Sequence, residues 1–453
     1  MTYPEAIAYL ESFINYEKIA SYPYKHSMKL ERMKDFLNIL DNPHLNLRCI
    51  HIAGTKGKGS TCAFITYILR EAGYKVGLYT SPHLSDFRER IRVLKSSASY
   101  SLDSGLKDFE GMISKKDLVR LVEGLKPAIE RYNKSSRYGH LSFFEVYTAL
   151  AFIYFKEKKV DFAVLETGLG GRLDATNVVN ALVCAITPIS YEHTRKLGST
   201  LTEIAQEKAG IIKIPNPKSQ VSNPIVICAP QPEEALRVIK DRSEQMRVRL
   251  YELNKDIFFE KTVKGFNVLG LFGEYPHLEI KLLGDHQLVN ATVAVAVTEA
   301  LRFYNIIIDA QAIRRGLCKT LWPGRCEVVS KQPWVVLDGA QNVASAEALK
   351  ETIKRYFRYK RLILVLGISK DKDIKGICNK LYDLAEIVVL TKASNPRASE
   401  PETLAKFFNN KLIYKTETVK EAKAEAKALA QKDDLILVTG SLFVVGEFRD
   451  DKV

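Results

Sequence analysis

Short apolar runs recur along the first two thirds of the chain, and most of them end in turns that contain glycine. The runs cover residues 47–53, 75–79, 162–165, 182–186 and 225–229. Between them, apolar residues recur with helical spacing at residues 61–72 and 144–155. This alternation is typical of a mostly parallel sheet with helices on its faces. The pattern therefore predicts a doubly wound α/β domain.

The last third of the chain predicts a second domain. Residues 265–269 and 277–283, separated by a turn that contains Gly273 and Pro276, predict an antiparallel pair of strands before a helix that begins at Asp285 or His286. After Leu301 the strand and helix alternation begins again, with strands expected at residues 334–337, 362–366, 387–390 and 435–438. We expect two domains, residues 1–308 and a smaller Rossmann-like α/β domain at residues 309–453.

Length and composition agree with a two-domain globular protein. The 453 residues exceed the roughly 100–200 residues that one core usually serves. The longest apolar runs are shorter than the ~20 residues of a membrane span. The polar N-terminus lacks a basic run followed by an apolar block, so we expect a cytoplasmic protein without a membrane partner. Seven cysteines form no CxxC pair, which predicts reduced thiols and no zinc site.

The net charge of +14 admits an anionic partner, but the basic residues are spread along the chain and alternate with 53 acidic residues. The densest basic cluster, residues 354–361, falls where a helix is expected to end, and cations are favoured there by the helix dipole. A solvated helix end is therefore favoured over a nucleic-acid surface. A nucleic-acid-dependent ATPase or binding module stays as a competing interpretation.

The most informative motif is a glycine loop, residues 54–60, between a predicted strand and a predicted helix. Backbone N–H groups of Gly54, Thr55, Gly57 and Gly59 can surround phosphate oxygens at a helix N-terminus. Lys58 can neutralise a phosphate, and Ser60 can reach its magnesium ion. The loop departs from the usual G-x-x-x-x-G-K-[ST] spacing because Lys58 precedes the last glycine. The combination still predicts a phosphate-binding site.

The variant G-x-x-G-K-G-S resembles the phosphate loop of the Mur ligase superfamily, in its folylpolyglutamate synthase and dihydrofolate synthase branch. Further blocks resemble that branch in the same order along the chain, from the N-terminus to about residue 446. They lie at residues 80–84, 87–91, 143–145, 166–177, 193, 197–198, 207–211, 286–287, 290–291, 322–325 and 338–342. As an ordered set, these blocks are specific for the family.

The resemblance implies an N-terminal P-loop-type ATPase domain and a C-terminal glutamate-ligase domain. It also implies ATP-dependent ligation of L-glutamate to the carboxylate of folate, through an acyl phosphate and with release of ADP and phosphate. Dihydropteroate is a second expected acceptor. ATP and two Mg²⁺ ions are the expected cofactors, and a monomer without a nucleic-acid partner is the expected form. A Mur-type ligase acting on a cell-wall nucleotide precursor is the alternative, disfavoured by residues 81–84 and by the lack of a separate N-terminal domain for a uridine nucleotide.

The resemblance also assigns residues. Expected metal ligands are Ser60, Glu166, His193 and a carbamylated Lys208, with Lys58, Lys208 and His193 as catalytic groups. The nucleotide is expected to contact Asn290 on the adenine side, Arg325 at the phosphates and Asp338, whereas Ser81, Pro82, His83 and Arg90 are expected near the folate. Without the resemblance, His193 would be interpreted as an ordinary loop histidine and Lys208 as a helix-end lysine. Arg325 would be equally consistent with a surface arginine and with a site residue.

Three positions and one segment depart from the family pattern. Glu192 stands where aspartate is usual, Gln341 replaces a histidine, and Lys56 occupies a common asparagine position. The serine-rich residues 96–105 form a longer connection than is typical. The side chain of Gln341 can donate and accept hydrogen bonds, but unlike histidine it cannot carry a positive charge near neutral pH. The departures leave the expected ATP site in place and allow a different rate or substrate preference.

Overall fold

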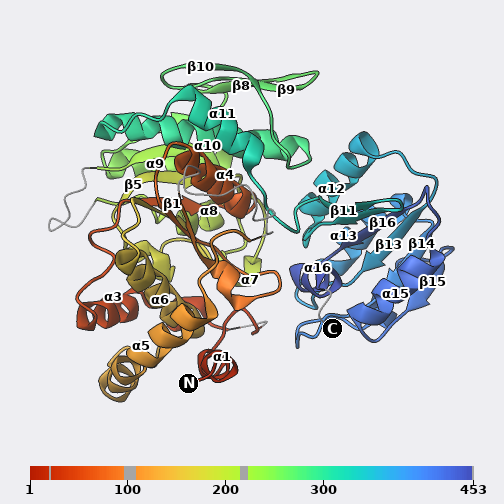
Figure 1. Cartoon of the computed structure of the whole chain (residues 1–453), viewed down its shortest axis with the longest axis horizontal. Helices are drawn as coiled ribbons and strands as arrows, with labels where there is room; N and C mark the ends of the chain where they lie inside the picture. Colours follow the sequence, from red (N-terminus) through yellow and green to blue (C-terminus); the bar gives the residue numbers. More distant parts are fainter. Residues whose placement is uncertain (20–21, 96–108, 215–222, 451–453) are drawn as a thin grey trace.

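The computed structural model describes residues 1–19, 22–95, 109–214 and 223–450. Two α/β bodies lie side by side, and the chain passes from the first to the second in residues 320–326 (Figure 1). The second body, coloured blue, is the smaller. No helix in these described ranges is long and apolar enough to cross a bilayer. All seven cysteines are free thiols, and only Cys318 is more than slightly exposed.

The larger body is built on a seven-stranded sheet with the order β3-β2-β4-β1-β5-β6-β7, parallel throughout except for β3. The five inner strands are buried along their whole length, which is why they are continuous apolar runs in the sequence. This confirms the predicted doubly wound domain. The strands are β1 (Cys49–Ala53), β2 (Val76–Tyr79), β3 (Ile91–Leu94), β4 (Phe162–Glu166), β5 (Ala181–Ile186), β6 (Ile225–Cys228) and β7 (Arg249–Glu252).

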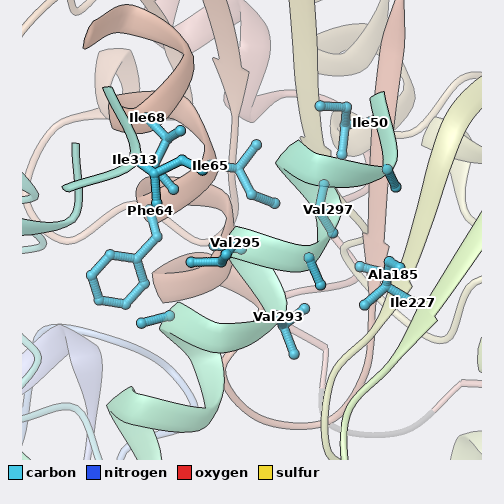
Figure 2. Close-up of a cluster of buried hydrophobic side chains, with 14 of the residues drawn as sticks. Ile50, Phe64, Ile65, Ile68, Ala185, Ile227, Val293, Val295, Val297 and Ile313 are labelled. Atoms are coloured by element: carbon cyan, nitrogen blue, oxygen red, sulfur yellow. The ribbon is translucent and has the colours of Figure 1, made fainter. Parts of the chain in front are cut away.

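Three helices cover one face of this sheet. Figure 2 shows side chains of α4 and α10, among them Ile65 and Val297, packed toward Ile50 and Ile227 of the sheet. Helix α10 is buried along nearly its whole length because α4 and the sheet enclose it. These helices are α4 (Lys58–Glu71), α10 (Asp285–Ala300) and α11 (Ala310–Lys319).

The other face is covered in two parts. Several helices on this face begin at a serine or threonine N-cap. One example is Ser142, whose side chain forms a capping box with Glu145 at the start of α6. Helices α1 (Tyr3–Glu11), α3 (Leu30–Ile39), α5 (Lys115–Ser135) and α6 (Phe143–Glu157) pack on one part of that face. The other part carries α2 (Tyr24–Ser27), α7 (Thr194–Leu197), α8 (Leu201–Ala209) and α9 (Glu233–Gln245).

A small antiparallel sheet, in the order β10-β9-β8, lies outside α10 and α11 (Figure 1). Its strands are β8 (Phe258–Thr262), β9 (Gly265–Leu269) and β10 (Glu274–Leu278). The strand predicted at residues 277–283 was therefore placed too late, because Pro276 was interpreted as part of the turn. Proline is tolerated in β10 because this is an edge strand, where an N–H group is not required for pairing.

The smaller body has a six-stranded sheet in the order β11-β12-β16-β13-β14-β15, with β11 antiparallel to β12. Four of its strands lie where the sequence predicted them. The strands are β11 (Glu327–Lys331), β12 (Trp334–Leu337), β13 (Leu362–Leu366), β14 (Ile387–Leu390), β15 (Leu412–Lys415) and β16 (Leu435–Thr439). The helices are α12 (Val343–Tyr356), α13 (Ile374–Leu381), α14 (Pro401–Ala405), α15 (Val419–Leu429) and α16 (Leu442–Arg449).

The predicted division at residues 308 and 309 falls just before α11. Ile313 and Leu317 of this helix are buried in the core of the larger body, and Gly316 lies against Ile68 of α4. Domains with those bounds stay a prediction, and the packing of α11 favours a later division, in residues 320–326. The serine-rich connection predicted at residues 96–105 lies outside the described residues.

Candidate active site

The glycine loop connects β1 to α4, and its shape is held by neighbouring residues. Gly57 has φ 81°, in the left-handed region, and a Cβ atom there would lie 2.1 Å from Oδ1 of Asn290. The backbone N–H groups of Thr55 and Lys56 both donate to the carbonyl of Pro188, at 3.1 and 3.2 Å. Glycine is therefore required at position 57, and Asn290 of α10 lies directly against the loop.

Opposite charges meet at the start of α4. Nζ of Lys58 lies 3.9 Å from Oε1 of Glu166, which ends β4, and the backbone N–H of Ser81 donates to Oε2 of Glu166 at 3.1 Å. Burial raises the pKa of Glu166, and the positive charge of Lys58 opposes that rise. Ser60 is buried in the first turn of α4 and lines the same cavity. A carboxylate, a hydroxyl and an ammonium group thus converge at the carboxyl ends of the strands.

His193 approaches this site from the start of α7, with its backbone in the left-handed region at φ 53°. Burial lowers the pKa of the imidazole to about 3, so the ring is neutral near pH 7 and a nitrogen lone pair is available to a metal. The adjacent Glu192 pairs with Lys372 of the smaller body at 3.4 Å. His193 therefore lies where the two bodies meet.

The donor set fits a magnesium ion. Ser60, Glu166 and His193 line one cavity and offer two oxygen ligands and a neutral imidazole. Oxygen ligands suit Mg²⁺, which keeps several waters and binds substrate phosphates. Within the described ranges, no group of three or more His, Cys, Asp or Glu side chains is arranged to hold a metal by itself. A metal ion here would therefore depend on the nucleotide for part of its coordination.

Lys208 lies behind the glycine loop. Its side chain is buried in the last turn of α8, and Nζ donates to the carbonyl of Gly54 at 2.7 Å. Burial, together with the nearby charge of Lys58, lowers the pKa of Lys208 to about 7. A substantial fraction of this amine is then unprotonated at neutral pH, which is the form that reacts with carbon dioxide.

The smaller body closes the cavity from the opposite side with Arg325, Asp338 and Gln341. The two carboxylate oxygens of Asp338 accept the backbone N–H groups of Cys326 and Ala340, both at 2.8 Å. Burial raises the pKa of Asp338, and the guanidinium of Arg325 opposes the rise. The cavity therefore lies between the glycine loop and a second charged wall. Expected residues that line it are Thr55, Gly57, Lys58, Gly59, Ser60, Glu166, His193, Asn290, Arg325 and Asp338.

A second cavity adjoins the first. Tyr22, Phe144, Leu173 and Phe443 form an apolar and aromatic part of its walls. Charged side chains also line it, namely the cations Lys196, Lys372 and Arg397 and the carboxylates Glu17, Glu145 and Asp174. Six residues line both cavities: Ser81, Pro82, Gly168, His193, Gln341 and Leu442. A molecule in the apolar cavity and a molecule in the charged cavity would therefore meet at this shared wall.

Comparisons with known proteins identify the family of both bodies. Residues 129–298 match the Mur ligase middle domain, and residues 324–442 match the Mur ligase glutamate ligase domain. The dihydrofolate synthase/folylpolyglutamate synthase of Bacillus subtilis is 38% identical over 429 residues, which cover 93% of this chain and 94% of that protein. This chain belongs to the folylpolyglutamate synthase/dihydrofolate synthase family.

Solved structures of the family have the same fold. A Mycobacterium tuberculosis folylpolyglutamate synthase complexed with ADP has a TM-score of 0.86 at 29% identity and covers 99% of this chain, with 98% of that chain matched. An Escherichia coli structure in complex with DHPP and ADP has a TM-score of 0.82 at 29% identity and covers 98% of this chain, with 96% of that chain matched. The chain is thus a ligase of the Mur ligase superfamily, and both of its bodies match domains of that superfamily.

In this family member, His83 and Arg90, which were expected near the substrate, lie behind residues of the apolar cavity. Arg90 is fully buried, donates to Nδ1 of His83 at 2.9 Å and pairs with both carboxylate oxygens of Glu17 at 2.9 and 2.6 Å. Neither His83 nor Arg90 lines the charged cavity or the apolar cavity, whereas Glu17, Ser81 and Pro82 line the apolar one. Arg90 therefore holds the carboxylate of Glu17 in position and does not itself face the cavity.

The sequence reasoning missed Glu17 and the three cations at the apolar cavity. Lys196 follows His193 by three residues, but Lys372 and Arg397 come from loops after β13 and β14 of the smaller body. Arg397 donates to the carbonyl of Glu17 at 2.6 Å and pairs with Asp371 at 2.7 Å. Isolated lysines and arginines in loops carry no local motif, so only the folded arrangement brings them together.

Proposed function

We propose that this family member uses ATP to join L-glutamate to the carboxylate of a folate-type acceptor, with release of ADP and phosphate. The observation that carries the proposal is the wall shared by the charged cavity and the apolar cavity. A flat aromatic acceptor in the apolar cavity would present its carboxylate at that wall. The γ-phosphate of ATP, held at the glycine loop, would lie on the other side of it.

The reaction has two steps. A carboxylate oxygen of the acceptor attacks the γ-phosphorus, the bond to the β-phosphate oxygen breaks, and ADP leaves. The amino nitrogen of glutamate then attacks the acyl carbon, phosphate leaves, and the nitrogen loses a proton. Such chemistry requires positioning and charge neutralisation more than a protein nucleophile.

Residues of this chain supply both requirements. Lys58 and Arg325 face the charged cavity from opposite bodies and would neutralise the phosphate oxygens. Ser60, Glu166 and His193 would hold Mg²⁺, which supplies charge neutralisation at the phosphates when bound. Asn290 would lie on the nucleotide side and Asp338 would contact the nucleotide from the smaller body. Closure of the two bodies would exclude water from the acyl phosphate.

The cations at the apolar cavity suit a substrate with free carboxylates. Lys196 carries a lowered pKa of about 8, caused by burial and by the neighbouring charges of Arg397 and Lys372. Lys372 already pairs with Glu192 and Arg397 with Asp371, so an added anion would mainly stabilise the ammonium form of Lys196. We therefore place the incoming glutamate between these three side chains and the shared wall.

One experiment can decide which compound accepts the glutamate. The Escherichia coli structure contains DHPP and the Bacillus subtilis relative is named for both activities, so we propose both dihydropteroate and reduced folate as acceptors. Purified protein with ATP, magnesium and labelled glutamate should label both acceptors and release ADP. Release of AMP and pyrophosphate would contradict the acyl-phosphate route, and labelling of only one acceptor would assign a single activity.

We further propose that the enzyme acts as a monomer in the cytoplasm and binds no nucleic acid. One chain supplies every wall of both cavities. In the basic cluster at residues 354–361, Arg355 pairs with Asp285 at 2.7 Å and Arg361 pairs with Asp434 at 2.6 Å, so part of its charge is already neutralised. Light scattering should give the mass of one chain, and a salt titration with single-stranded DNA should give no specific binding.

A further inference from the structure

Trp322 lies in the segment that connects the two bodies, and its indole ring packs against the glycine loop. A Cβ atom built on Gly59 would lie 3.1 Å from Nε1, 3.2 Å from Cζ2 and 3.3 Å from Cε2 of Trp322. These three atoms form one edge of the indole. Because Gly59 has no side chain, the indole edge can lie close to the loop at this position, which is next to Lys58 and Ser60 in the sequence.

The face of the same indole is covered from the other side. The guanidinium carbon of Arg92 lies 5.9 Å from the ring centroid, and the side chain of Arg92 is fully buried. Nε of Arg92 donates to the carbonyl of Glu110 at 2.7 Å, which fixes the orientation of the guanidinium. A desolvated cation over an indole face attracts it more strongly than an exposed one does. The indole is thus held between a strand of the sheet and the glycine loop.

From Trp322 the chain runs through a tight turn to Arg325. Gly324 has φ 73°, its N–H donates to Oε2 of Glu327 at 2.8 Å, and its carbonyl accepts the N–H of Gly339 at 3.0 Å. Nη1 of Arg325 in turn donates to the carbonyl of Gly324 at 3.0 Å. These bonds hold Gly324 and Arg325 to Glu327 and Gly339 of the smaller body. Trp322 is linked to this turn through the backbone of Pro323, so a displacement of the indole would reach Arg325 along the chain.

We propose that Trp322 is a positioning residue, whose indole sets the distance between Arg325 and the glycine loop. The inference rests on the proposed nucleotide site but not on the identity of the acceptor. Packing alone is the competing explanation, because Trp322 also borders the core of the larger body. The two explanations differ in whether the effect of Trp322 passes through Arg325.

A double-mutant cycle with Trp322→Leu and Arg325→Ala separates them. We expect Trp322→Leu to lower kcat/KM for ATP about 10- to 100-fold, the scale of one electrostatic contact in the transition state. Trp322→Phe, which keeps an aromatic face for Arg92, should recover most of that loss. In the Arg325→Ala background, Trp322→Leu should have little further effect, because the group that it positions is gone. Full additivity of the two substitutions would overturn the proposal.

The second tryptophan provides a matched control. Trp334 packs on Phe357 within the smaller body, away from both cavities, so Trp334→Phe should leave kcat/KM and the KM for ATP unchanged. The chain has only two tryptophans, so this variant also makes Trp322 the single emitter.

A binding measurement keeps the test independent of ligase activity and of any folding defect in Trp322→Leu. In the Trp334→Phe protein, a non-hydrolysable ATP analogue should shift the emission of Trp322, because the phosphates would bind at the glycine loop, whose Gly59 lies against the indole edge. The dissociation constant from this shift should agree with calorimetry. Calorimetric binding without an emission change would overturn the proposal. An emission change in a protein that ligates neither acceptor would refute the proposed function and leave the positioning role standing.

Discussion

At the scale of single residues, two lysines lie on opposite sides of the glycine loop and have different electrostatic surroundings. Lys58 faces the cavity, where Glu166 is its nearest carboxylate, at 3.9 Å. Lys208 is buried behind the loop, where its partner is the carbonyl of Gly54. The first faces the place proposed for the phosphates, whereas burial lowers the pKa of the second because it disfavours the ammonium form.

Lys58→Ala should abolish most turnover and leave the fold intact. Loss of one positioned phosphate contact costs several kcal/mol at the transition state, which is a decrease of about 100- to 1,000-fold in kcat. Steady-state kinetics and a thermal melt measure the two effects. Lys56→Asn, at the neighbouring loop position, is the control and should retain activity. Near-native turnover of a well-folded Lys58→Ala protein would remove Lys58 from the mechanism.

For Lys208 we propose a carbamate as the working form. Lys208→Ala should then be nearly inactive, and added acetate or formate should restore part of the activity, because a small carboxylate replaces the missing anion. Propionate, which is larger, and methylamine, which is a cation, serve as controls for size and charge. Rescue by methylamine but not by acetate would indicate that Lys208 acts as an ammonium group.

At the scale of elements, helix α11 depends on a close approach to α4. A Cβ atom on Gly316 would lie 2.4 Å from Cα of Ile68, a distance that the backbone of α4 cannot relieve by a rotamer change. Helix α5 offers the opposite case, because a Cβ atom on Gly124 would meet nothing within 4 Å. The same substitution should therefore have opposite signs in the two helices.

Gly316→Ala should lower the free energy of unfolding by roughly 1–3 kcal/mol, the usual cost of overpacking a core. Gly124→Ala should raise it by roughly 0.5–1 kcal/mol, because alanine restricts the unfolded chain and favours the helix. Urea unfolding at matched protein concentration measures both. Stabilisation by Gly316→Ala would mean that the two helices do not pack as described.

Which elements the sequence predicts depends on how they are buried. Strands such as β13 and β14 are enclosed on both faces and stand out as apolar runs. Peripheral strands with mixed sequences, such as β7 and β15, gave no such run and were missed. The glycine loop was predicted because its chemistry is local. The cations Lys196, Lys372 and Arg397 were not, because helix α7 of one body and two loops of the other bring them together.

At the scale of the whole molecule, the two bodies are connected by one segment of chain and by a few side chains. Asp285, at the start of α10, pairs with Arg355 of α12 at 2.7 Å and also contacts Lys261 of β8. Lys372 pairs with Glu192 across the cleft. The first bridge is exposed and therefore screened by salt, whereas the second is nearly buried and screened less.

Asp285→Asn should weaken closure slightly, since an exposed pair contributes at most about 1 kcal/mol. We expect the KM for ATP to rise by a factor of about 2 to 5 at low salt, in keeping with that energy, and to approach the native value at high salt, where the bridge is already screened. Lys350→Gln is the control, because Lys350 pairs with Asp383 inside the smaller body. A salt-independent difference between Asp285→Asn and the native protein would contradict the bridge.

The wall shared by the two cavities has a consequence for how ATP is spent when the acceptor is missing. Ser81, Gly168 and Gln341 line both cavities, so water in an empty apolar cavity would have access to the place proposed for the γ-phosphate. A bound acceptor would block that access with its own carboxylate. The acceptor would thus be both the nucleophile and a barrier to water, so that its binding and the closure of the two bodies together would couple ATP cleavage to ligation.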